Sequence, residues 1–170
     1  MEEDILGHFF EWVHISAAFM FLIGVGGWFL TISHAGKEKE VKSINSLVSL
    51  GIKFKNYLMF PGETILFFAG LLAAWRGEVP ILGFLQGGDV NWLLVSLILF
   101  LIRIPVIMMV AVPNEKALNK TLAEALGKGQ VTTELTSALS DKTAKRANIY
   151  SIATYAVIVF FDGNGTLLVS

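Results

Sequence analysis

The chain has 170 residues, of which 54% are hydrophobic and 16% are charged, and its mean hydropathy is +0.64. This composition is too apolar for an ordinary soluble domain and predicts a single integral membrane domain over residues 1–170. The net charge of −1 gives no support to nucleic-acid binding. Since the chain lacks cysteine, disulfides, thiolate metal sites and thiol nucleophiles are excluded. No signal peptide is apparent, because the start MEEDILGH has no basic region.

The first apolar segment, residues 9–33, is long enough to cross a bilayer as a helix. Small and polar residues recur in it at steps of three and four, which places them on one helix face: Ser16, Met20, Gly24, Gly27 and Thr31. Small residues on one face let another membrane helix approach closely. We therefore expect a membrane span with a packing side.

Three further apolar segments follow, at about 57–75, 92–112 and 147–168. Tyr57, Trp75 and Trp92 lie at segment ends, as expected for side chains at the level of the lipid headgroups. Pro113 is expected to end the third helix. The sequence thus predicts an all-α fold, a four-transmembrane-helix bundle.

Lysine and arginine predict the orientation of this bundle. Eleven of them lie in the connections after the first and third segments, and only Arg76 lies in the connection after the second. By the positive-inside rule, both basic connections are cytoplasmic and both termini are outside. The longer connection repeats leucine every four residues, at Leu118, Leu122 and Leu126, after a predicted N-cap at Asn114. This predicts a short amphipathic helix on the inner membrane surface, with a loop helix packed on the bundle as the alternative.

Glu63 and Arg103 are ionisable residues within apolar segments, where each needs a partner or water. Glu63 lies roughly 9 Å and Arg103 roughly 13 Å from the inner end of its helix. We expect them to form an ion pair, with Pro61 and Pro105 bending the helices around it. The pair either locks two helices together or belongs to a proton or ligand site.

His14 and Asp162 form a second candidate pair. His14 lies about 8 Å inside the outer surface, and Asp162, roughly 22 Å from the inner side, reaches a comparable depth. Tyr155 shares the polar face of the fourth segment with Asp162. A carboxylate bonded to imidazole suits a ligand or a proton relay, and the alternative is a simple hydrogen bond between helices.

The histidines also raise the question of haem b. His14 and His34 are 20 residues apart on one helix, roughly 30 Å, so both cannot ligate the same haem. Histidine–methionine ligation at the inner end remains an alternative, with His34 and the methionines Met59, Met108 and Met109. A haem shared with another subunit is the second alternative. No metal-ligand cluster and no complete catalytic constellation is predicted.

Several motifs resemble a known family. They are His14, the glycines Gly24, Gly26 and Gly27, the Arg103–Pro105 pair and the basic entry KRANIYS at Lys145–Ser151. On these residues the chain resembles a bacterial predicted-integral-membrane family of unknown function with four helices, which implies the bacterial inner membrane. It is more weakly similar to the haem-associated membrane protoporphyrinogen oxidase and copper-resistance families, which also place a histidine in the first helix.

Two functions follow as expectations. The favoured one is a non-catalytic, multi-pass accessory subunit that contacts the bilayer and other membrane subunits, in a respiratory or photosynthetic electron-transfer complex. An enzyme is less expected, because no catalytic residues are identified. The alternative is a redox or proton-handling protein that binds haem b or quinone through His14, Asp162, Glu63 and Arg103.

Overall fold

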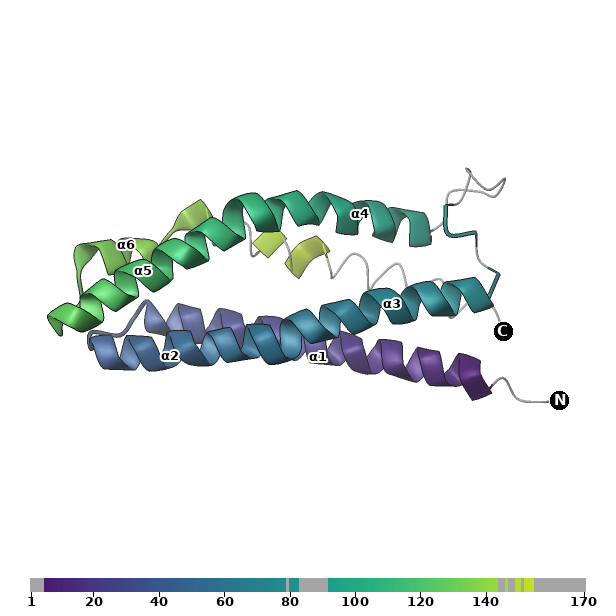
Figure 1. Ribbon diagram of the computed structural model, residues 1–170, viewed down its shortest axis with the longest axis horizontal. Coiled ribbons are helices and arrows are strands. Elements are labelled where there is room, and N and C mark those ends of the chain that lie inside the picture. Colours follow the sequence, from purple (N-terminus) through teal and green to yellow (C-terminus); the bar gives the residue numbers. More distant parts are fainter. Residues whose placement is uncertain are drawn as a thin grey trace. The chain divides into compact units, whose positions relative to one another are not determined.

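The computed structural model describes residues 5–78, 80–82, 92–143, 146, 149–150 and 152–154. All regular elements in these residues are helical, and the chain divides into two compact units, Met1–Ile81 and Leu82–Ser170 (Figure 1). Three helices of the described part are long and apolar enough to cross a membrane: Ile5–Ala35, Val41–Arg76 and Leu93–Lys128. Most of the fourth predicted span, about 147–168, lies outside the described residues.

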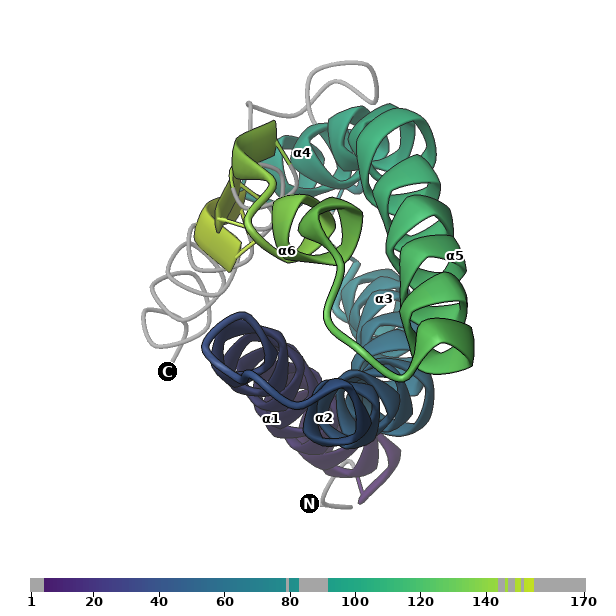
Figure 2. The same cartoon turned by 90° about the vertical axis from the view of Figure 1, so that its left-hand side faces the viewer.

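The first unit is a hairpin of two long helices. Helix α1 (Ile5–Ala35) packs along a second helix that consists of α2 (Val41–Phe54), a π-helical turn η1 (Lys55–Met59) and α3 (Phe60–Arg76) (Figures 1 and 2). The start predicted at residue 57 is therefore wrong by 16 residues. Helix α2 is amphipathic, with hydrophobic residues facing α1, and nothing in its sequence interrupts the helix before the apolar segment begins.

The second unit contains α4 (Trp92–Val106), the π-helical turn η3 (Ile107–Ala111), α5 (Val112–Lys128) and α6 (Thr133–Leu139), and α6 lies beside α5 (Figure 2). The predicted helix end at Pro113 is wrong, because α4, η3 and α5 form one continuous helix. Asn114 lies inside α5 and is not an N-cap. The separate amphipathic helix is also not observed, since its residues continue the preceding helix to Lys128.

Each π-helical turn ends two residues before a proline. In η1 the Phe60 N–H donates to the Lys55 carbonyl, five residues earlier, and Pro61 follows. In η3 the Val112 N–H donates to the Ile107 carbonyl, and Pro113 follows. Proline lacks an N–H, and its ring collides with the carbonyl four residues earlier unless the helix widens. The π-helical distortions therefore occur before Pro61 and Pro113, and Pro105 lies inside α4.

Among the described residues, three almost fully buried large side chains lie outside the apolar segments. They are Ile44 and Val48 of α2 and Leu135 of α6, each less than 2% exposed. Within the apolar segments, large side chains such as Phe19 and Leu101 are more than half exposed. Water drives the burial of apolar side chains, whereas lipid does not. We therefore expect α2 and the α5–α6 pair to lie in water and the exposed faces of the apolar segments to contact lipid.

Candidate functional site

Glycines of α1 make the closest approach between the two helices of the first unit. Gly24 lies directly against the backbone of Leu58 and Met59 in η1, with no room for a Cβ atom. One turn along α1, a methyl group at Gly27 would lie 2.5 Å from the Phe54 ring. The π-helical turn is therefore seated on the glycine face of α1, which confirms a packing role for this part of the predicted stripe.

Glycines of the second helix also contribute, and Gly51 and Gly62 are not among the residues predicted from the sequence. A methyl group at Gly62 would lie 2.7 Å from the Phe21 backbone nitrogen, and one at Gly51 would lie 2.7 Å from the Thr31 hydroxyl oxygen. Thr31 donates its own hydroxyl hydrogen within α1, to the carbonyls of Gly27 and Trp28. Gly51 and Gly62 lie on either side of η1, so a constant helical period along the sequence does not identify them as one face.

The outer half of the predicted stripe does not follow the same contact with the second helix. Ala17 and Phe21 are 3% and 2% exposed, whereas Ser16 is exposed and Met20 is half-buried. Ala17 and Phe21 face the second helix, so the packing role predicted for Ser16 is not at this intrachain contact. The stripe turns away from α3 at its outer end.

Ser16 and Met20 instead line an open apolar groove on the hairpin. The groove has a volume of about 280 Å³ and is formed by Phe9, Trp12, Val13, Ser16, Ala17 and Met20 of α1 with Ile65 of α3. Its lining combines small side chains, Ser16 and Ala17, with large apolar ones such as Phe9 and Trp12. Its chemistry suits an apolar partner such as a helix or an acyl chain.

His14 lies at the contact between α1 and α3. Its ring is half-buried, and a methyl group at Gly70 would lie 3.0 Å from Cε1 and 3.3 Å from Nδ1. The missing side chain at Gly70 therefore provides the space that the imidazole occupies. The proposed partner Asp162, like Tyr155, lies outside the described residues, so this pair stays a prediction.

His34 lies near the other end of the same continuous helix, which confirms that the two histidines are too far apart to share a haem. Its side chain is exposed, and Nδ1 donates to the Leu30 carbonyl at 2.9 Å. A neutral ring in this tautomer has Nε2 as its acceptor, which is the atom that ligates metals. In the described part of the chain no group of three or more metal-binding side chains is found.

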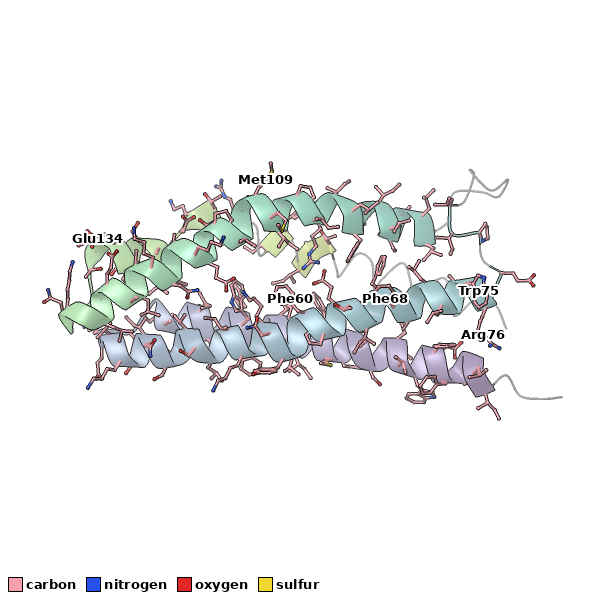
Figure 3. All side chains as sticks on the ribbon, viewed as in Figure 1. Phe60, Phe68, Trp75, Arg76, Met109 and Glu134 are labelled. Carbon is pink, nitrogen blue, oxygen red and sulfur yellow. The ribbon has the colours of Figure 1, made fainter. Side chains whose placement is uncertain are left out.

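Glu63 and Arg103 occupy two different units. Glu63 is half-buried in the first turn of α3, and Arg103 is 3% exposed near the end of α4. Their ion pair therefore stays a prediction. At the other end of α3, Trp75 and Arg76 are both exposed, as Figure 3 shows, and this position suits anchoring at a membrane surface.

Lys55 is the first residue of η1, the turn between α2 and α3. Its ammonium group is 5.5 Å from the centre of the Phe60 ring, across the π-helical turn. Neighbouring Lys53 is exposed. The charged and apolar parts of the second helix therefore meet at η1.

One comparison with known proteins gives a match. Neither a curated protein nor a solved structure matches the chain. Residues 8–161 match the model of the family described as predicted integral membrane protein (DUF2269). This match spans the glycine contacts, His14, Arg103 and both π-helical turns. Together with the three candidate membrane spans, it shows that the chain belongs to this family of integral membrane proteins.

Proposed function

We propose that this protein is an accessory subunit that packs through its membrane helices against a larger respiratory or photosynthetic electron-transfer complex. The observation that carries the proposal is the apolar groove on the outer half of α1. The inner half of the predicted stripe is covered by the second helix, whereas Ser16 and Met20 lie in the open groove. A groove lined by small and apolar side chains suits the packing of a helix from another subunit.

Isolation from native membranes in a mild detergent tests this proposal. We expect the wild-type protein to elute with other membrane subunits at a size well above that of a small oligomer. Ser16→Phe fills the groove and is expected to release the protein from the complex. Ile23→Phe is the matched control, because Ile23 is an exposed apolar residue of α1 outside the groove. Elution of the wild-type protein as a small oligomer, or equal behaviour of the two variants, would contradict the proposal.

A redox or proton-handling function is the second candidate. It is favoured by the 3% exposure of Arg103 in an apolar helix and by the position of His14 in the notch at Gly70. Ionisable groups at such places are costly and often belong to cofactor or proton sites. An absorption spectrum of the purified protein with a Soret band would support haem b, and extraction of quinone with the protein would support a quinone site. A colourless, quinone-free preparation would exclude both cofactors.

A further inference from the structure

The second helix of the first unit changes its geometry at one place, the turn η1. The Phe60 N–H is bonded to the Lys55 carbonyl, and the next residue, Pro61, has no N–H to offer to the carbonyls before it. A helix interrupted in this way resists bending less than a regular α-helix does. The turn also separates two segments of different character, the amphipathic α2 and the apolar α3.

Helix α1 passes through the same region without interruption. Along the contact, Gly51 and Gly70 are 19 positions apart, whereas their partners Thr31 and His14 are only 17 apart. The second helix therefore uses two more residues than α1 to cover the same length. A π-helical turn contains more residues per turn than an α-helical turn, so η1 accommodates this excess.

Gly24 of α1 lies against this turn. A Cβ atom here would overlap the Met59 backbone and would lie 2.8 Å from its Cα atom. Backbone atoms cannot turn aside as a flexible side chain can, so the turn can hold this position only while residue 24 is glycine. The contact with the turn leaves no room for a side chain at Gly24. At the neighbouring Gly26 there is room, because a methyl group there would meet nothing within 4 Å.

We propose that η1 is a hinge at which α2 moves relative to α3, and that the contact with Gly24 holds it in the conformation observed. The hinge lies where the apolar part of the helix ends, between the exposed Lys53 and Pro61. Motion there would change the contacts of α2 with α1, where Gly51 lies against Thr31 and Phe54 against Gly27. The second unit has the same arrangement at η3 and Pro113, so a π-helical turn shortly before a proline occurs twice in the described residues.

Distances between spin labels on α2 and α3 test the hinge. The chain has no cysteine, so Ser46→Cys and Leu72→Cys provide two labelling sites, both exposed, about 39 Å apart along a regular helix. Electron–electron double resonance in detergent or nanodiscs then gives the distance distribution. We expect a main distance and a minor one in the wild-type background. Pro61→Ala should leave one narrow distance, because the restored N–H allows a regular helix.

Gly24→Ala and the matched control Gly26→Ala complete the test. Gly24→Ala is expected to raise the minor population at least twofold, because the methyl group pushes η1 off α1, whereas Gly26→Ala should match the wild type. Far-UV circular dichroism verifies that each variant is folded. If Gly24→Ala does not fold, Pro61→Ala still tests the hinge. A single narrow distance in the wild type, or equal distributions in the wild type and Pro61→Ala, would overturn the proposal.

Discussion

The imidazole of His14 occupies the space into which a side chain at Gly70 would project. A methyl group on Gly70 would lie 3.0 Å from the His14 Cε1 atom and 3.3 Å from Nδ1. The position of this histidine is therefore set by the shape of α3 and not only by its own helix. Any ligand or proton that His14 binds would depend on a residue that carries no functional group.

Gly70→Ala should displace the His14 ring. The new methyl group is closer than most real Cβ contacts allow, and the ring can move where backbone could not. We expect a shift of the His14 ring resonances in a ¹H–¹⁵N spectrum of the protein in detergent. The net change in stability should be small, since crowding of about 1–3 kcal/mol is opposed by the helix preference of alanine over glycine, about 1 kcal/mol. Unchanged His14 resonances would show that the ring is not held by this notch.

Gly62→Ala should be more costly than Gly70→Ala. The methyl group would lie 2.7 Å from the Phe21 nitrogen and 3.0 Å from the Ala17 carbonyl oxygen, both backbone atoms of α1. Separation of the helices is the only relief, so we expect a loss of about 1–3 kcal/mol. Gly26→Ala, which meets no neighbour, should instead stabilise the helix by up to about 1 kcal/mol. The midpoint of unfolding by sodium dodecyl sulfate ranks the stabilities of these variants. A midpoint of Gly62→Ala equal to or higher than that of the wild type would contradict the prediction.

The apolar helices of this fold could be predicted because a membrane span requires a long run of apolar residues. The helix boundaries could not be predicted in the same way. Helix α2 is amphipathic and joins α3 without a break, and the hydropathy change at Tyr57 marks a change of surroundings for one continuous helix. At Pro113 the widened turn η3 accommodates the proline, so the helix continues where the sequence predicts its end.

The candidate site could be predicted only in part. The glycine face of α1 is visible in the sequence because Gly24, Gly27 and Thr31 repeat at helical spacing. Its partners on the second helix are harder to recognise, because the π-helical turn shifts the phase between Gly51 and Gly70. A pattern analysed at a constant helical period cannot include such a shift. The pairing of Glu63 with Arg103 depends on contacts between distant segments, which periodicity within one helix does not specify.

Thr132 should stabilise the start of α6. Its hydroxyl oxygen accepts a hydrogen bond of 3.2 Å from the Leu135 N–H, and Leu135 is fully buried. Thr132→Ala is expected to cost about 1 kcal/mol. Amide hydrogen exchange at Leu135 should accelerate about fivefold, the factor that this energy gives. Thr136→Ala is the control, because its exposed hydroxyl donates only to the carbonyl of Thr132, within the helix. Equal exchange in the two variants would exclude capping by Thr132.

The start of α6 should also lose stability at acid pH. The pKa of Glu134 lies below its ordinary value of 4.5, first because a backbone N–H donates to its carboxylate, and then because of the Thr132 hydroxyl and the Lys128 charge. A lowered pKa means that the carboxylate stabilises the folded state above pH 4.5. This contribution decreases as the pH falls below 4.5 and through the folded pKa. Exchange at α6 should rise over this range in the wild type, and Glu134→Gln should remove that dependence. A rise of the same size in Glu134→Gln would assign it to other groups.

The orientation of the first unit can be tested with single cysteines, because the chain contains none of its own. Helix α2 carries exposed lysines and a well-buried face, as expected for a helix in water on the cytoplasmic side. Ser46→Cys on α2 should therefore be protected from a membrane-impermeant maleimide in intact cells and should react after the cells are opened. Gly77→Cys, in the exposed turn after α3, should react in both cases. The burial of Ile44 and Val48 does not specify the side of the membrane, so the opposite labelling pattern would reverse the topology while the hairpin itself remained intact.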